Sequence, residues 1–386
     1  MKVLMFNTRL GAVQAWGGDT TQMVETGKAL QHLGVEVEIL ADEIGCDVSR
    51  CDLVHLFNLQ TAENGLRLLA AARAARKPVA LSTIYWDLRY ARHPDNLRFG
   101  DGAFWAKFAG VAPKMAMLLQ RVRQVPGQRR QLRAQSSLLL GADVILPNSV
   151  AELENLVAQF GLPQLRARAV IVPNAVSPPT SLPADGPSQC TAGLPEEFVL
   201  MAANFHPIKG QARLIQALMK DPQIPLVFVG RGGTNTSYGR HCHQLAERRG
   251  NTFFVDAVPH ELMPQLYRRA KVHALPSLRE SPGLASLEAA VHGANCVAAV
   301  HAPVQEYFGL DCFICDPMFP ASVRKAILAA WNAQPTGRLR DRILRDFTWP
   351  KAAEETLRGY QWVLQKGGGP ASDAAPPPRH AVLSSA

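Results

Sequence analysis

Long apolar runs are absent from this sequence, and charged residues are few. No apolar stretch reaches the ~18 residues that a membrane-spanning helix needs. Charged residues make up 19% of the 386-residue chain and hydrophobic residues 47%, a balance typical of globular proteins. The apolar run within residues 1–10 is short and soon interrupted, so it predicts a first strand rather than a signal peptide. We therefore expect a cytoplasmic protein, long enough for two domains.

Cysteine is also scarce. The seven cysteines are an odd number spread over a long chain, which argues against a disulfide framework. Cys312 and Cys315 form a CxxC motif without a second pair, so buried thiols are the favoured interpretation over a metal or redox site. The run 241–243 (His-Cys-His) could bind a metal, but adjacent helical residues do not share a face.

Basic residues outnumber acidic ones. The formal net charge is +9 and the pI is about 9.3, which favours anionic partners such as nucleotides or phospholipid headgroups. Nucleic acid is disfavoured, because no compact basic motif with interleaved aromatic residues is present.

Short apolar runs alternate with helical patterns in both halves of the chain. Those in the first half span 3–6, 35–40, 53–57, 79–84, 144–146 and 170–172, and those in the second span 198–202, 226–229, 252–255, 272–275, 296–300 and 312–314. Strand–helix alternation of this kind predicts an α/β protein with parallel, doubly wound sheets. A segment rich in Pro, Ser and Gly, 177–195, separates the halves and reads as a linker. We expect the ligand site between the two domains, at the carboxyl ends of the strands.

The most informative stretch is 271–293, a strand, a turn and a helix. Ser281 is a plausible N-cap, Pro282 suits the first helical position, and Gly283 keeps the helix entrance open. The free N–H groups of a helix start favour phosphate. Glu280 and Glu288 flank this start, and two acids beside an anion site suggest ligands that also carry sugar hydroxyls. The stretch therefore predicts a nucleotide-sugar site.

Three glycine-bearing turns follow other predicted strands. Gly17 and Gly18 precede a helix, but their spacing does not match the dinucleotide fingerprint, and a flexible loop is an equal alternative. Lys209, before Gly210, could meet phosphate at a helix entrance or could be a solvated surface lysine. Arg231, in the turn 229–233, could pair with phosphate or simply be exposed.

Together these pieces resemble the retaining glycosyltransferases of family 4 (group 1 glycosyltransferases), which have the GT-B fold of two Rossmann-like domains. The resemblance runs from Met1 to about Leu364. Its most specific part is 280–288, in which two glutamates are separated by seven residues. Further matches are Gly17-Gly18, residues 172–176, Lys209-Gly210, Gly230 and Pro276-Ser277, and residues 347–360 resemble the family's terminal helix.

The resemblance implies an acceptor-side domain (1–176), a nucleotide-sugar domain (196–345) and a helix returning to the first domain (346–364). Composition and patterning add a basic insertion within the first domain (89–140), the linker (177–195) and a disordered tail rich in Gly, Pro and Ala (365–386).

The resemblance also implies roles for individual residues. Glu288 would bind the ribose hydroxyls, Glu280 would contact the donor sugar, and Lys209 would neutralise the leaving nucleotide. Donor contacts would come from Gly17, Gly18, Asn204, Lys209, Gly210, Arg231, Ser281, Pro282, Gly283, Leu284, Ala285 and Glu288. No metal and no cofactor is expected. Sugar would pass from a nucleotide diphosphate sugar to a hydroxyl of a glycan or lipid-linked glycan with retention, as in polysaccharide biosynthesis.

Two positions depart from the family pattern. Asn204 stands where an arginine is common, and we expect Arg231 or Arg279 to supply the missing charge. Tyr85, Trp86 and Asp87 stand where many members have a histidine, so Asp87 joins Glu280 and Lys209 as a candidate catalytic residue, while Trp86 could equally be buried.

A catalytically weak or inactive nucleotide-sugar-binding homologue and a same-fold epimerase are the alternative functions. The basic insertion could place the protein at the inner face of the membrane, against anionic lipid, or could be a solvated helical pair.

Overall fold

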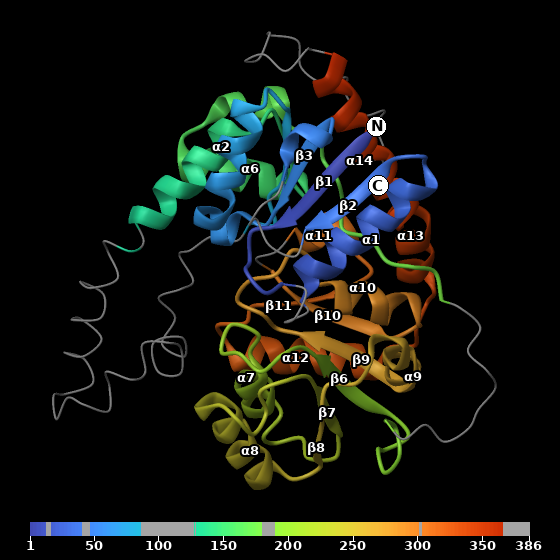
Figure 1. The fold of residues 1–386 in the computed structure, drawn as a ribbon. Helices are drawn as coiled ribbons and strands as arrows, with labels where there is room; N and C mark the ends of the chain where they lie inside the picture. Colours follow the sequence, from blue (N-terminus) through green and yellow to red (C-terminus); the bar gives the residue numbers. More distant parts are fainter. Residues whose placement is uncertain are drawn as a thin grey trace, which may run out of the picture. The chain divides into compact units, whose positions relative to one another are not determined.

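The computed structural model describes residues 1–12, 17–40, 47–85, 127, 129–179, 190–300 and 303–365. The chain divides into two compact units (Figure 1). The first unit comprises Met1–Trp86, Val125–Asn174 and Trp349–Ala386, and the second comprises Asp87–Gln124 and Ala175–Thr348. Each unit contains one parallel β-sheet covered by helices.

The sheet of the first unit has the strand order β2-β1-β3-β4-β5, and every pair in it is parallel. Its strands are β1 (Lys2–Asn7), β2 (Glu36–Leu40), β3 (Leu53–Phe57), β4 (Val79–Ser82) and β5 (Val144–Leu146). All residues of β3, β4 and β5 are buried, which explains why they read as nearly unbroken apolar runs. The α/β class with parallel sheets is confirmed.

The sixth strand predicted at 170–172 is wrong. Val170 and Val172 donate their amides to the carbonyls of Ile145 and Pro147, at 3.0 and 2.9 Å, and Ala169 forms an isolated bridge with Ile145. Proline has no amide hydrogen, so Pro147 cannot donate back and the ladder cannot continue past it.

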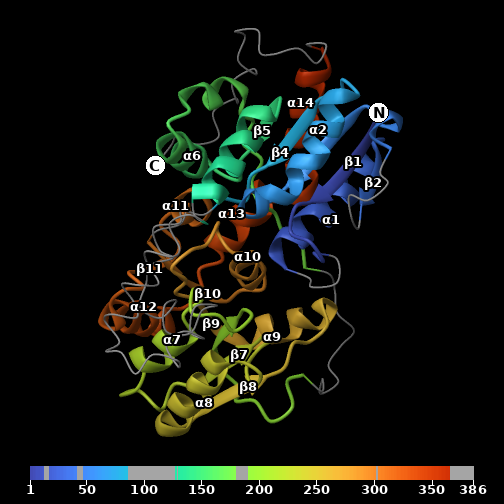
Figure 2. The same cartoon turned by 60° about the vertical axis from the view of Figure 1, so that its left-hand side comes forward.

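The helices of the first unit cover both faces of its sheet (Figures 1 and 2). They are α1 (Gly18–His32), α2 (Leu66–Ala74), α6 (Val150–Phe160), α14 (Trp349–Gln365) and a helix within 129–141, with 3₁₀ turns η1 (Val48–Arg50), η2 (Leu59–Gly65) and η4 (Pro163–Arg168). The helices α2, α6 and 129–141 share a core with inward side chains such as Leu4 and Leu56. The glycines of α1 and α14 let these helices approach the sheet: a Cβ on Gly359 would lie 3.0 Å from Leu146 Cδ2.

Helix α14 is joined to the first sheet by a buried hydrogen-bonded chain. The hydroxyl of Tyr360 lies 2.6 Å from Nδ1 of His55 in β3, and Nε2 of His55 lies 2.9 Å from the Ser82 hydroxyl in β4. All three side chains are buried. Burial lowers the pKa of His55 to about 3, so this imidazole is neutral.

The second unit contains a parallel sheet with the order β11-β10-β9-β6-β7-β8. Its strands are β6 (Phe198–Ala202), β7 (Leu226–Val229), β8 (Thr252–Val255), β9 (Ala270–Leu275), β10 (Asn295–Ala299) and β11 (Phe313–Cys315). The order changes direction at β6 and β9, which lie side by side although some 70 residues separate them. Ligands commonly bind at such a switch point, beyond the carboxyl ends of the strands.

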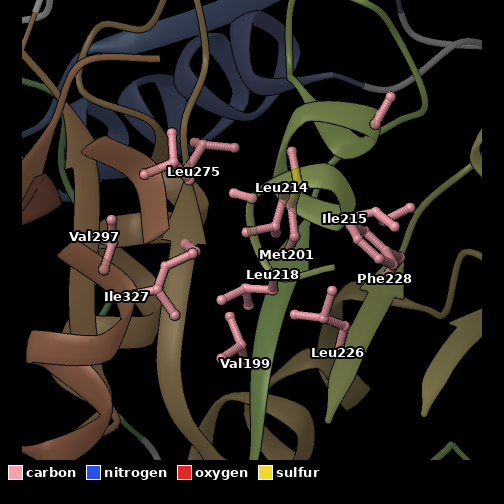
Figure 3. Close-up of a cluster of buried hydrophobic side chains, with 14 of the residues drawn as sticks. Val199, Met201, Leu214, Ile215, Leu218, Leu226, Phe228, Leu275, Val297 and Ile327 are labelled. Carbon is pink, nitrogen blue, oxygen red and sulfur yellow. The ribbon is translucent and has the colours of Figure 1, made fainter. Parts of the chain in front are cut away.

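Alternating side chains divide the core of the second unit between the two faces of the sheet. Val199 and Met201 pack with residues of α7, α8 and α12 (Figure 3), whereas Phe198 and Leu200 pack with residues of α9 and α10. The helices are α7 (Gln211–Ala217), α8 (Ser237–Arg249), α9 (Met263–Arg269), α10 (Leu284–Val291), α11 (Val304–Phe308), α12 (Pro320–Asn332) and α13 (Arg338–Asp346), with the 3₁₀ turn η5 (His260–Leu262).

Several predicted segments lie outside the described residues in whole or in part. These are most of the basic insertion 89–140, the centre of the linker 177–195 and nearly all of the tail 365–386. Among the helices that the structure describes, none is both long and apolar enough to cross a membrane.

The cysteines of the described ranges are free thiols. Burial raises the pKa of Cys312 and of Cys315 to about 12, which makes these thiols poor nucleophiles. Cys242 is packed in the core and His243 stacks on Phe254, with ring centroids 3.8 Å apart. Over the described part of the chain, no cluster of His, Cys, Asp and Glu is arranged to hold a metal ion.

Candidate functional site

The loops that follow β6 and β9 are bound to each other. The amide of Leu278, in the turn after β9, donates to the carbonyl of Ile208 at 2.8 Å. Gly210 has a φ of +91°, and a Cβ there would lie 2.8 Å from the carbonyl oxygen of Pro276. The backbone conformation and the close approach both require glycine. The sequence motifs around Lys209 and Glu280 therefore meet at the switch point of the sheet.

An ion pair forms where these loops meet. Lys209 Nζ lies 2.6 Å from Glu280 Oε2, and the two side chains are 27% and 11% exposed. A lysine ammonium has three hydrogens, so one bond to Glu280 leaves two for another anion. Glu280 Oε1 takes no hydrogen bond from the described residues, which leaves it able to accept one from a hydroxyl.

Helix α10 starts later than the sequence suggested. Its N-cap is Gly283, with a φ of +92°, and its first residue is Leu284, so Ser281 and Pro282 belong to the preceding turn and no side chain caps the helix. A Cβ on Gly283 would lie 2.8 Å from Leu275 Cδ2, and this crowding, together with the positive φ, fixes the start. The first amides of a helix lack intrahelical acceptors, so those of Leu284 and Ala285 are oriented for an anion.

Glu288 lies in α10, about one turn after its start, and its carboxylate is bound by two side chains. Tyr267 in α9 donates its hydroxyl to Oε2 at 2.7 Å, and His260 Nε2 lies 2.9 Å from Oε1. The sequence analysis missed both residues. No motif marks them, because their role depends on how α9 and η5 pack beside α10.

The turn after β7 is held against the loop after β6. Gly230 has a φ of +152°, and a Cβ there would lie 2.2 Å from the carbonyl oxygen of Ala203. Asn204 Oδ1 accepts the amide of Arg231 at 3.1 Å, while the amide of Phe205 donates to the Arg231 carbonyl at 2.8 Å. Asn204 thus holds the backbone of Arg231, and the Arg231 side chain is exposed. Arg279 is buried.

Gly17 and Gly18 lie in the first unit, at the start of α1. Gly17 is the N-cap of α1, and no side chain of the described residues caps the helix start. The carboxylate of Asp19 instead accepts hydrogen bonds from Arg9, at 2.8 Å to each oxygen, and from Asn7 at 3.0 Å. Burial of Asp19 acts to raise its pKa, but the bonds and charge of Arg9, with smaller contributions from the amides, lower it overall.

The segment 85–87, which stands where many family members have a histidine, is described only up to Tyr85. Tyr85 is buried, and its amide donates to Glu152 Oε1 at 2.7 Å. Trp86 and the candidate catalytic residue Asp87 lie outside the described residues.

Comparison with known families agrees with this geometry. Residues 191–343, which include Lys209, Glu280 and Glu288, match the family model described as "Glycosyl transferases group 1".

Two relatives are D-inositol 3-phosphate glycosyltransferases. That of Geodermatophilus obscurus is 26% identical over 271 residues, covering 65% of this chain and 59% of the relative. That of Xylanimonas cellulosilytica is 29% identical over 262 residues, covering 63% of this chain and 62% of the relative. The matched region thus spans about three fifths of these relatives.

Solved structures resemble the fold over nearly the whole chain. Sucrose-phosphate synthase from Thermosynechococcus elongatus superposes with a TM-score of 0.71 at 16% identity, over 95% of this chain and 100% of that one. A glycosyltransferase from Rickettsia africae gives a TM-score of 0.66 at 12% identity, over 94% and 98%. The fold is the GT-B type, and residues 191–343 resemble the group 1 glycosyltransferases.

Proposed function

We propose that the protein transfers a sugar from a nucleotide diphosphate sugar to a hydroxyl of a glycan or lipid-linked glycan, with retention at the anomeric carbon. The observation that carries this proposal is the arrangement around α10: a cation at Lys209, carboxylates at Glu280 and Glu288, and free amides at the helix start. A nucleotide sugar offers the matching groups, namely a diphosphate and two sets of hydroxyls.

Each group has a task in the transfer. The diphosphate binds the amides of Leu284 and Ala285, and the ammonium of Lys209 neutralises the charge that grows on its outer phosphate as the bond to the sugar breaks. Glu280 orients Lys209 through Oε2 and accepts a sugar hydroxyl at Oε1. The acceptor oxygen bonds to the anomeric carbon on the face from which the nucleotide leaves, and the acceptor proton departs with the nucleoside diphosphate. Because the proposed charge neutralisation comes from Lys209 and backbone amides, we propose that no metal is required.

A binding screen followed by a turnover assay tests this function. We expect one of UDP-, GDP-, ADP- or TDP-sugars to raise the melting temperature, because a ligand that binds only the native state stabilises it. With an acceptor mixture, the same donor should release free nucleoside diphosphate. Binding without release would instead support an inactive nucleotide-sugar-binding homologue, and a product with altered sugar stereochemistry would support an epimerase. No binding to any donor would overturn the proposal.

Arg231 is the candidate for the positive charge that Asn204 does not supply. Replacing Arg231 by alanine is expected to weaken donor binding about tenfold, because a hydrogen bond from a charged group to phosphate is lost. Calorimetric titration of the donor measures the effect. Arg248→Ala, which removes an equally exposed arginine from the last turn of α8, is the control. Unchanged donor affinity in Arg231→Ala would remove Arg231 from the site.

A further inference from the structure

The carboxylate of Glu288 is restrained on both of its oxygens. Tyr267 Oη donates to Oε2 at 2.7 Å and His260 Nε2 lies 2.9 Å from Oε1. The Glu288 side chain is 17% exposed, so part of this side chain still reaches solvent. A carboxylate that accepts a fixed donor on each oxygen cannot rotate without breaking both bonds.

Tyr267 is the rigid member of this arrangement. Tyr267 is 2% exposed, and its ring contacts the rings of His273 and His292, with centroids 6.3 and 5.9 Å away. Burial, followed by the charge of Glu288, raises the pKa of Tyr267 well above its usual value, so the hydroxyl remains a donor. His260 is the more exposed member, with a side chain that is 68% exposed.

The bonds from Tyr267 and His260 use only part of the hydrogen-bonding capacity of the Glu288 carboxylate. An ionised carboxylate has about four acceptor positions, two on each oxygen. Among the described residues only Tyr267 and His260 occupy these positions, one on each oxygen, so they leave one acceptor position on each oxygen for a ligand. Two open acceptors on a fixed carboxylate match two neighbouring hydroxyls, as in the 2′ and 3′ hydroxyls of ribose.

We propose that Tyr267 and His260 are positioning residues that hold Glu288 ready to accept both hydroxyls of a ribose, so that the site selects ribonucleotide donors over deoxyribonucleotide donors. The inference rests on the proposed function, because it assigns the ribose of the donor to Glu288. It adds that this selectivity depends on two residues that do not themselves touch the ribose.

The test measures how much ribose recognition each residue supplies. Dissociation constants of UDP, GDP and ADP are compared with those of their 2′,3′-dideoxy counterparts, for wild type and Tyr267→Phe. We expect Tyr267→Phe to weaken binding of the preferred ribonucleotide about tenfold and binding of its dideoxy form less than about twofold. His260→Ala should act in the same direction more weakly, and His260→Gln, which keeps an N–H donor, should restore much of the loss.

A matched control separates positioning from general destabilisation. Tyr360→Phe also removes a fully buried hydroxyl, which bonds to His55 in the other unit, and it should leave the ratio of the two affinities unchanged. If wild type discriminates and Tyr267→Phe weakens ribonucleotide and dideoxynucleotide equally, the positioning role is wrong while the donor assignment stands. If wild type binds nucleotides without discriminating, the ribose role of Glu288 fails, and if it binds none, the proposed function fails.

Discussion

Replacing Lys209 by alanine is expected to lower turnover about 100- to 1,000-fold, because charge on the leaving phosphate grows in the transition state and Lys209 is placed to neutralise it. The ammonium is already held within 2.6 Å of Glu280 before any donor arrives, so little reorganisation is needed at the moment of reaction. The loss should fall mainly on kcat, since an interaction that strengthens in the transition state contributes less to donor binding. Initial rates of nucleoside diphosphate release at several donor concentrations measure it.

Lys271 provides a closely matched control for Lys209. It pairs with Glu197 at 2.8 Å, and its side chain is 25% exposed against 27% for Lys209. It is the second residue of β9, at the amino end of the strand, whereas the ligand loops follow the carboxyl ends. Lys271→Ala should keep turnover within about twofold of wild type, as expected for a partly exposed ion pair. Folded Lys209→Ala with wild-type kcat would refute the assigned role.

Most of the strands could be predicted well from the sequence because their residues are buried on both faces, whereas those of β8 are only partly buried. The predicted runs 53–57, 144–146, 198–202, 226–229 and 252–255 coincide with strands. The run 170–172 has the same composition, but its would-be partner contains Pro147, and pairing depends on that partner rather than on the run itself.

The candidate site could be predicted only in part. Lys209 and Glu280 each follow a strand, so their meeting follows from a parallel sheet in which β6 and β9 are neighbours. The start of α10 was misplaced by two residues, because Ser281 and Pro282 are good helix-start residues by local preference. The positive φ of Gly283 and its packing against Leu275 instead place the first residue of the helix at Leu284. Tyr267 and His260 carry no local signal, since only tertiary packing brings them to Glu288.

The first unit is expected to lose stability steeply as the pH falls below about 6.5. Its fold buries the imidazole of His55, which must therefore stay neutral while the unit is folded. The pKa of His55 is lowered from 6.5 to about 3 by burial. Between these two values the unfolded chain binds one proton more than the folded chain, so the free energy of unfolding falls with pH. The slope for this one group is about 1.4 kcal/mol per pH unit, or roughly 3 kcal/mol between pH 6.5 and pH 4.5. Above pH 6.5 the full contribution is present.

The change in the free energy of unfolding per pH unit, rather than its value at one pH, identifies His55 as the cause of the acid sensitivity. Urea unfolding between pH 4 and pH 7, followed by hydrogen exchange at the amides of β3, reports on the first unit. His55→Asn should reduce the slope by about 1.4 kcal/mol per pH unit whatever it costs in stability at pH 7. Tyr360→Phe removes the bond to His55 but keeps the buried imidazole, so it should lower stability and leave the slope as in wild type. Equal slopes in wild type and His55→Asn would contradict the prediction, because proton uptake by His55 would then contribute nothing to unfolding. The expected pattern would instead establish that protonation of the buried His55 is coupled to unfolding of the first unit, independently of its bond to Tyr360.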